Sequence, residues 1–142
     1  MKIKHSTRFY LASDFARVDE VNRYARQLRM RGYIVECRWL DGAHQLHPEA
    51  ATIDTTRDEI PIEASVFALD DLSDIRNCDI LLAFTDPPYT KTNRGGHHVE
   101  FGFALGQGTP VVIIGPRENV FHCMPNVVQF KTWEEFIKEL TV

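Results

Sequence analysis

The sequence predicts a doubly wound α/β domain built on a five-stranded parallel sheet, and three observations lead to this fold class. Short apolar runs alternate with amphipathic helical segments along the chain. Residues 79–85 and 110–114 are almost continuously apolar, which is typical of parallel strands covered on both faces. The 142 residues fit one domain, 1–142, that can bury a core without disulfides.

The first predicted unit is strand, helix, strand. Residues 7–12 form the first strand, and Ser13 and Asp14 offer N-cap chemistry for the helix that follows. Apolar residues recur in this helix at spacings of three and four, namely Val18, Val21, Ala25 and Leu28. Gly32 ends the helix, and residues 33–39 form the second strand. Such a unit implies parallel pairing with a right-handed crossover.

A long polar segment, residues 40–61, is predicted to be a surface loop of the kind that serves as a lid or binding loop. A second helix follows from Pro61 to about Asn77. Its expected apolar face consists of Ala64, Ala68, Leu72 and Ile75, with Asp70, Asp71 and Asp74 on its other faces.

The remaining elements are a strand at 79–85, a helix from about His97 to Gln107, and strands at 110–114 and 127–130. Thr132 caps a closing amphipathic helix. Five strands connected in this way favour the flavodoxin-like, Rossmann-like order 2-1-3-4-5. Ligands of such sheets bind beyond the carboxyl ends of the strands, which here carry residues 10–14, 86–96 and 115–122.

Several familiar motifs are missing from the sequence. It contains no GxxxxGK loop, no GxGxxG after the first strand and no GxSxG. An ATPase, a conventional dinucleotide-binding enzyme and a serine hydrolase of that kind are therefore not supported. Sixteen Lys and Arg against 20 Asp and Glu also argue against binding of polymeric nucleic acid.

The most informative segment lies between Arg94 and Gly108. Gly95 and Gly96 precede a helix N-terminus, where backbone N–H groups are open to a ligand. Glu100 is predicted in the first turn of that helix, where compensation of the helix dipole is an alternative explanation for it. Gly102 and Gly106 weaken the helix, so we expect it to pack closely against a neighbour.

Several motifs together make the chain resemble the nucleoside 2-deoxyribosyltransferase family over about residues 7–137. They are Tyr10-Leu11-Ala12-Ser13, Asp71-Leu72-Ser73-Asp74-Ile75, Cys78-Asp79-Ile80-Leu81, the glycine-rich run Gly96 to Gly108 around Glu100, and Pro110-Val111-Val112. The superfamily includes hydrolases that remove the base from nucleoside 5′-monophosphates. The resemblance implies cleavage of an N-glycosidic bond in 2′-deoxynucleosides or 2′-deoxynucleotides.

The resemblance also implies roles for single residues. Glu100 matches the nucleophile that forms a glycosyl-enzyme intermediate, Tyr10 the tyrosine that holds its carboxylate, and Asp71 the acid near the leaving base. Asn119 matches the asparagine that reaches across a subunit interface, which implies a homodimer or larger homo-oligomer. The remaining candidate substrate contacts are Ser13, Asp86, Arg94, Gly95, Gly96, His97 and Phe121.

Arg94 departs from the pattern of many transferases, which carry an acid six residues before the nucleophile. A guanidinium group binds phosphate oxygens bidentately, so Arg94 favours a 5′-monophosphate substrate and a hydrolase. Pairing of Arg94 with Asp86 is the structural alternative. A non-catalytic nucleotide-binding module remains a third hypothesis for the chain.

No cofactor and no metal site are expected. His44 with His47, or His97 with Glu100, supply too few converging ligands for a transition metal. Cys37, Cys78 and Cys123 are predicted to be reduced and buried. No apolar run is long enough for a membrane span, and Met1 to His5 do not resemble a signal peptide, so a cytoplasmic protein is expected.

Overall fold

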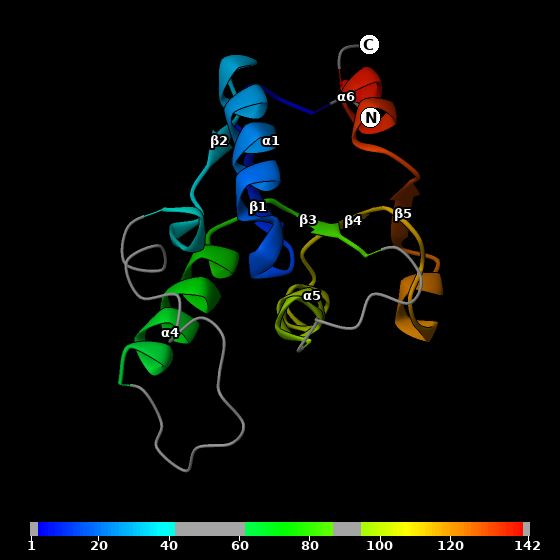
Figure 1. The fold of residues 1–142 in the computed structure, drawn as a ribbon. Helices are drawn as coiled ribbons and strands as arrows, with labels where there is room; N and C mark the ends of the chain where they lie inside the picture. Colours follow the sequence, from blue (N-terminus) through cyan, green and yellow to red (C-terminus); the bar gives the residue numbers. More distant parts are fainter. Residues whose placement is uncertain (1–2, 42–61, 87–94, 141–142) are drawn as a thin grey trace.

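A five-stranded parallel sheet runs through the computed structural model, with helices on both faces (Figure 1). The structure describes residues 3–41, 62–86 and 95–140. The strands are β1 (Arg8–Ala12), β2 (Ile34–Val35), β3 (Ile80–Phe84), β4 (Val111–Ile114) and β5 (Val127–Phe130). All neighbours pair in parallel in the order β2-β1-β3-β4-β5, which confirms the predicted fold class and strand order.

Two helices cover each face of the sheet. On one face lie α1 (Val18–Met30) and α6 (Trp133–Leu140), and on the other lie α4 (Ile62–Arg76) and α5 (Gly96–Gly106) (Figure 1). Three short 3-10 turns, η1 (Phe15–Arg17), η2 (Arg38–Leu40) and η3 (Val120–Cys123), follow β1, β2 and β4. Asp14 caps η1, and Thr132 accepts a hydrogen bond from the N–H of Glu135 in α6, as their positions in the sequence predict.

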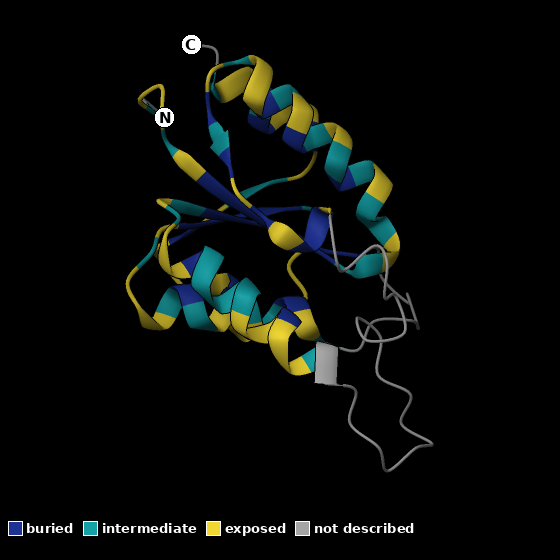
Figure 2. Ribbon diagram, turned by 90° about the vertical axis from the view of Figure 1, so that its left-hand side faces the viewer, coloured by how far each residue is buried: buried dark blue, intermediate teal, exposed yellow. Residues whose placement is uncertain are grey.

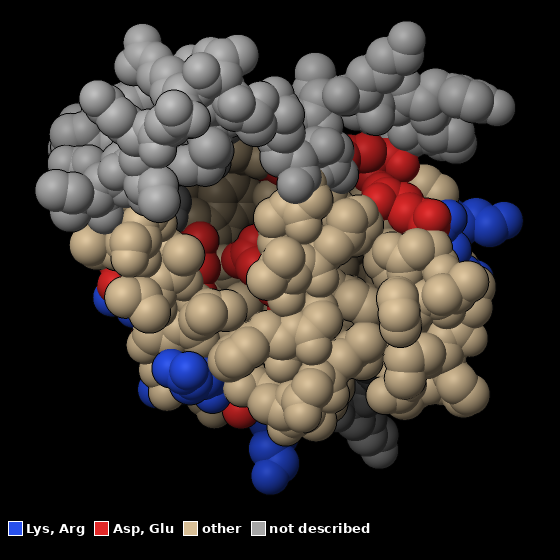
Figure 3. All heavy atoms as spheres, turned by 90° about the horizontal axis from the view of Figure 1, so that it is seen from below, with Lys and Arg blue, Asp and Glu red and all other residues tan. Residues whose placement is uncertain are grey.

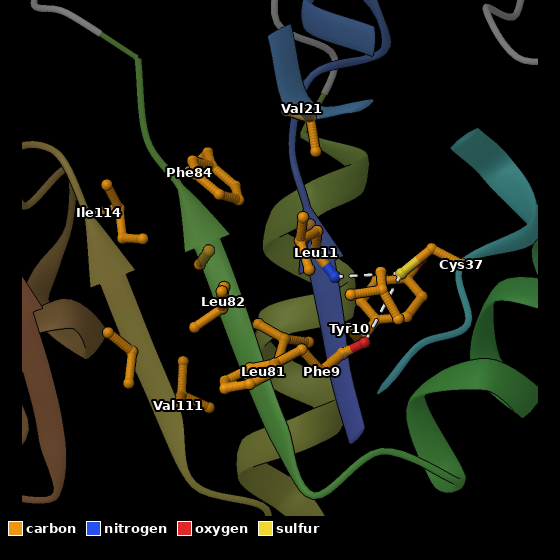
Figure 4. Close-up of a cluster of buried hydrophobic side chains, with 14 of the residues drawn as sticks. Phe9, Tyr10, Leu11, Val21, Cys37, Leu81, Leu82, Phe84, Val111 and Ile114 are labelled. Carbon is orange, nitrogen blue, oxygen red and sulfur yellow. Dashed lines mark hydrogen bonds between the residues drawn. The ribbon is translucent and has the colours of Figure 1, made fainter. Parts of the chain in front are cut away.

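The core lies between the sheet and the two helical layers, where buried residues concentrate in Figure 2. Strand side chains alternate between the two faces. On β1, Phe9 packs edge-on against Phe136 of α6, whereas Tyr10 points to the opposite side and reaches α5. Figure 4 shows the strand side chains of this core at close range. The fold thus places the Tyr10 hydroxyl on the side of the sheet that α5 covers.

The second strand is shorter than predicted, because Cys37 and Trp39 use their side chains where a longer strand would use its backbone. The backbone N–H of Leu11 donates to Cys37 Sγ at 3.2 Å (Figure 4). Trp39 Nε1 donates to the carbonyl oxygen of Leu11 at 2.7 Å. Both backbone groups of Leu11 are therefore occupied, and the chain turns into η2 after β2.

Helix α4 departs from its predicted apolar face at one position. Ile75 is buried and Ala64 and Leu72 are half-buried, as predicted, but Ala68 is exposed and Phe67 is buried instead. The reason is polar: Arg38 of η2 binds Asp70 at 3.0 Å and Asp74 at 2.9 Å. These two contacts turn the acidic positions of α4 toward the rest of the protein.

All three cysteines are free, as predicted, but only Cys37 is buried. Cys78 is half-buried and Cys123 is exposed on η3, because η3 follows the sheet edge and is covered on one side only. The predicted loop at 40–61 falls almost entirely outside the described residues. Within the described part of the chain, no helix combines the length and the apolar character that a bilayer span requires.

Candidate active site

The central feature of the site is a hydrogen bond between a strand and a helix. Tyr10 lies in the middle of β1 and is fully buried, and its hydroxyl donates to Glu100 Oε2 on α5. The sequence folds in this way because alternation along β1 turns Phe9 and Leu11 toward α1 and α6, leaving Tyr10 to face α5. The two residues are 90 positions apart in the chain.

Glu100 lies in the second turn of α5, which corrects its predicted place in the first turn. The helix begins at Gly96 because Gly95 adopts a left-handed conformation, φ 83°, and acts as its N-cap. A helix dipole acts mainly on its first turn. Dipole compensation therefore accounts poorly for an acid at this position.

Asp71 of α4 is the second acid of the site, and one of its carboxylate oxygens is inaccessible to solvent. Burial and the charge of Asp71 raise the pKa of Glu100 to about 8, although the hydrogen bond from Tyr10 acts in the opposite direction. Burial, together with the charges of Glu100 and Asp71, also raises the pKa of Tyr10 well above its usual value. We call Asp71 and Glu100 the acid pair.

This arrangement suits proton transfer and nucleophilic attack. A carboxyl group with a pKa of about 8 exchanges a proton near neutral pH, and its ionised form is held in place by the Tyr10 hydroxyl. On the same helix, Arg38 binds Asp70 and Asp74, the acids that precede and follow Asp71 in the chain. In Figure 3, acidic atoms are visible in a hollow near the middle of the face that α4 and α5 cover.

Ser13, Asp86 and His97 lie beyond the ends of the strands and form a second group. All three are buried. The Ser13 hydroxyl donates to the Asp14 carbonyl oxygen at 3.1 Å, and Arg17 donates to Asp86 Oδ1 at 3.3 Å. Burial and the neighbouring His98 lower the pKa of His97, so its ring is neutral at pH 7.

The other predicted contacts are more dispersed. A Cβ added at Gly96 would meet no described atom within 4 Å, so the described residues leave room beside the start of α5. Asn119 caps η3, accepting a hydrogen bond from the Phe121 N–H at 3.0 Å, and Phe121 is 61% exposed. Arg94 falls outside the described residues. The structure therefore brings together Tyr10, Asp71 and Glu100, but places Asn119 and Phe121 on a separate turn.

Sequence patterns missed Arg17 and Glu118, which lie next to the second group. Arg17 binds Glu20, Asp86 and the carbonyl oxygen of Thr85, and only its spacing to Glu20 on one helical face gave a signal. Glu118, His98 and His122 meet through different elements: His98 Nε2 lies 2.9 Å from Glu118 Oε2, and the Glu118 N–H donates to His122 Nδ1. No local spacing encodes contacts of that kind.

Helix α5 packs against the sheet and α4, as expected, but Gly102 and Gly106 lie away from that packed side. Both are exposed, and a Cβ added at either would meet no described atom within 4 Å. Helix α5 turns its buried side, Phe101 and Ala104, toward the sheet and leaves the glycines outside. Arg117 lies against β5, where it binds Gln129.

Comparison with known proteins gives structural neighbours only. No protein-family model and no curated protein matches the sequence. The structure is similar to a 2-deoxyribosyltransferase of Bacillus psychrosaccharolyticus, with a TM-score of 0.63, 20% identity, and coverage of 92% of this chain and 90% of that one.

Two other solved structures are similar over almost their full length. A CMP N-glycosidase of Clostridium botulinum has a TM-score of 0.56 and 16% identity, with coverage of 96% of this chain and 100% of that one. A conserved protein of Enterococcus faecalis V583 has a TM-score of 0.64 and 16% identity, covering 96% and 98%. At these identities the likeness concerns the fold: the chain has the same α/β fold as a deoxyribosyltransferase and an N-glycosidase.

Proposed function

We propose that the protein is an enzyme that cleaves the N-glycosidic bond of 2′-deoxynucleosides or of their 5′-monophosphates. One observation carries the proposal: Glu100 is held by the Tyr10 hydroxyl beside a second acid, Asp71. The fold shared with enzymes that act on such bonds supports it. Perturbed carboxyl groups in this arrangement are typical of functional sites.

In the proposed reaction, the ionised Glu100 carboxylate attacks the anomeric carbon of the sugar. The C–N bond breaks as the C–O bond to Glu100 forms, and the base leaves with the bonding electron pair. Asp71 is the acid placed to supply the proton that the leaving nitrogen needs. Tyr10 keeps the carboxylate in line and stabilises its charge until the oxocarbenium-like transition state is reached.

The second half of the reaction decides between a transferase and a hydrolase. Attack by a second base on the anomeric carbon releases Glu100 and gives a new nucleoside, whereas attack by water gives the free sugar or sugar phosphate. Asp71, now ionised, accepts the proton of the attacking group in either case. The same three side chains serve both outcomes, so the acceptor available at the site determines the product.

Hydrolysis of nucleoside 5′-monophosphates is the second candidate. The open space at Gly96, beside the N-terminus of α5, suits an anionic group, because helix N-termini attract phosphate. Arg94, two residues before Gly96, adds a positive charge in the sequence. A non-catalytic nucleotide-binding module is the third candidate, which would bind the same ligands without releasing base.

The proposal is tested by incubating the protein with matched deoxynucleosides and 5′-monophosphates, with and without an acceptor base, and separating the products by chromatography. Release or exchange of base is expected. Glu100→Gln should reduce the rate on the order of 10³-fold or more, since it removes the nucleophile. Glu36→Gln, an exposed acid paired with Arg8, is the matched control and should retain activity.

An inert wild-type protein that is stabilised by one of these ligands in a thermal melt would favour the binding module. Release of base by Glu100→Gln at the wild-type rate would overturn the assigned nucleophile. Comparison of each nucleoside with its 5′-monophosphate separates the two enzymatic candidates.

We also propose that two copies of the chain associate through the exposed side of α5 and η3. Val99, Val120 and Phe121 are 67%, 77% and 61% exposed, and Gly102 and Gly106 present bare backbone on α5. His98 and His122, with ring centroids 5.6 Å apart, join the two segments. A second copy covering this surface would recover the stability that the helical glycines sacrifice, and would bring Asn119 to a neighbouring site.

Sedimentation of the purified chain tests the association, and a dimer is expected. Phe121→Asp and Val99→Asp should shift the protein toward a monomer, whereas Val66→Asp, an equally exposed position on α4, should not. A wild-type monomer at high concentration would contradict the proposed association.

A further inference from the structure

A cluster of three potential metal ligands lies at the start of α5, apart from the acid pair. His97 and His98 come from α5, and Glu118 comes from the segment between β4 and η3. One ligand atom of each residue lies within 4.8 Å of the others. Glu118 Oε2 is the common point, 2.9 Å from His98 Nε2 and 3.9 Å from His97 Nε2.

These distances are close to those of a four-coordinate zinc site. With bonds of about 2.0–2.1 Å, the ligand atoms of a tetrahedral site lie roughly 3.3 Å apart. Small side-chain rotations would bring both histidine nitrogens and the carboxylate to that spacing without moving the backbone. Two imidazoles and one carboxylate are also a ligand set that zinc-class ions favour.

The cluster is held in place by further contacts, as metal ligands usually are. Glu118 Oε1 accepts a hydrogen bond from the Asp86 N–H at 2.6 Å, which leaves Oε2 facing the histidines. The Glu118 N–H donates to Nδ1 of the buried His122 at 3.0 Å. Glu118 is therefore held through both its backbone N–H and its carboxylate before any ion binds.

Three acids lie near the cluster. Glu118, Asp86 and Asp14 act on the His97 ring, whereas burial and His98 act in the opposite direction. Arg17, which reaches Asp86, is itself bound to Glu20 at 2.8 Å, so its charge is shared between two acids. In the single chain, the side chains of His98 and Glu118 are 33% and 21% exposed.

We propose that His97, His98 and Glu118 bind one divalent transition-metal ion of the zinc class. Three protein ligands leave a fourth position for water or for an oxygen of a small ligand. This site was not predicted from the sequence, because Glu118 follows the histidines by some 20 positions and belongs to another element. The proposal concerns metal binding alone and does not depend on the glycosidase function.

The alternative is a simple hydrogen bond, in which His98 Nε2–H donates to Glu118 and no ion binds. Full-length protein treated with a chelator and dialysed is titrated with Zn²⁺ by calorimetry, and with Co²⁺ while the visible spectrum is recorded. We expect one equivalent of zinc per chain with a Kd of about 1 µM or tighter. Bound Co²⁺ should show the intense visible absorption of a four-coordinate site.

The variants decide where the ion binds. His98→Ala and Glu118→Gln should each weaken binding by at least about 10-fold. The double variant His44→Ala/His47→Ala, which removes the other close histidine pair of the sequence, should bind zinc like the wild type. Circular dichroism of each metal-free variant separates loss of the ligand from loss of the fold.

Two outcomes would overturn the proposal. One is wild-type protein that binds zinc no more tightly than about 100 µM, in the range of weak surface sites. The other is tight binding that His98→Ala and Glu118→Gln both leave unchanged while the variants stay folded. A loss of binding in the His44→Ala/His47→Ala control alone would place the ion elsewhere and contradict the proposal as well.

Discussion

The two groups of acids on the α5 side of the sheet have opposite surroundings. Glu118 is met by a backbone N–H and by two imidazoles, and Asp86 is met by a guanidinium. Glu100 is met by a hydroxyl and by a second acid, Asp71, and its pKa is raised to about 8. Glu118 and Asp86 have partners that stabilise a carboxylate. The acid pair, in contrast, is maintained at a cost to stability, which is typical of functional sites.

Of the substitutions that test this difference, removal of the Asp71 carboxylate is expected to change the rate most. Asp71→Asn should lower the rate of base release by about 10²–10⁴-fold, because the leaving base loses its proton donor. It should also lower the pKa of Glu100, since the charge of Asp71 raises that pKa. A pH–rate profile measures both effects, with the ascending limb moved to lower pH.

Asp70→Asn is the matched control, one position away on α4, where the side chain binds Arg38 instead. It should keep the wild-type profile. Equal losses in the two variants would mean that Asp71 acts only by maintaining helix α4.

Removal of the Tyr10 hydroxyl has a smaller and opposite effect on the profile. The hydrogen bond from Tyr10 lowers the pKa of Glu100, so Tyr10→Phe should move the ascending limb to higher pH. At pH 7 the rate should fall by about 10–100-fold, as expected for loss of one charge-assisted hydrogen bond of about 1.5–3 kcal/mol. Tyr33→Phe, a buried tyrosine against Phe9, is the control; a profile shift in it, or none in Tyr10→Phe, would contradict the assignment.

The acid pair should also affect the free energy of unfolding and its dependence on pH. Because the folded protein holds the Glu100 pKa near 8 against an ordinary 4.5, the unfolded chain loses that proton at lower pH. The free energy of unfolding should therefore decrease as pH rises from about 4.5 to 8. Glu100→Gln, which has no proton to lose, should be more stable than the wild type at pH 8 by about 4 kcal/mol, and equally stable at pH 4.

Chemical denaturation at the two pH values, in a buffer with a chelator, measures the difference. Glu36→Gln, exposed beside Arg8, should show no such pH-dependent gain. A Glu100→Gln variant that is less stable than the wild type at pH 8 would mean that the Tyr10 contact outweighs the burial of the charge.

The smallest effect is expected for a substitution beside Asp86. Arg17→Met removes the guanidinium from Asp86, Glu20 and the Thr85 carbonyl oxygen. We expect a loss of about 1–2 kcal/mol in unfolding free energy, because Asp86 is buried. Arg26→Met, exposed on the following helix α1, should be neutral within about 0.5 kcal/mol. If Arg17→Met were more stable than the wild type, the contacts of Asp86 with Arg17 would not be stabilising, contrary to the difference described above.

The sequence predicted the sheet better than the details of the site. Apolar runs mark β3 and β4 closely, because a strand buried on both faces leaves a continuous signal. The end of β2 was not predictable, because it depends on two side chains that bind the backbone of Leu11. The exposed position of Ala68 on α4 was missed as well, on a helix whose Asp70 and Asp74 bind Arg38.

The site residues also divide into those that local sequence motifs identify and those that depend on contacts between distant segments. Tyr10, Asp71 and Glu100 were selected through the resemblance of short motifs, and the structure brings these three side chains together. Periodicity alone would have placed Asp71 on a solvent face and Glu100 in a first turn. The contacts of Glu118 join segments that are distant in the chain, and no pattern within either segment encodes them.

The short second strand has a consequence for how the protein assembles. A long edge strand offers free backbone groups on which another chain can add as a new strand, and this is a common route to aggregation. Here β2 comprises only Ile34 and Val35, after which the chain turns into η2. That edge offers little to a growing sheet, so the contacts of Cys37 and Trp39 with Leu11 act as protection against fibre-like self-association and leave helical surfaces as the route to ordered oligomers.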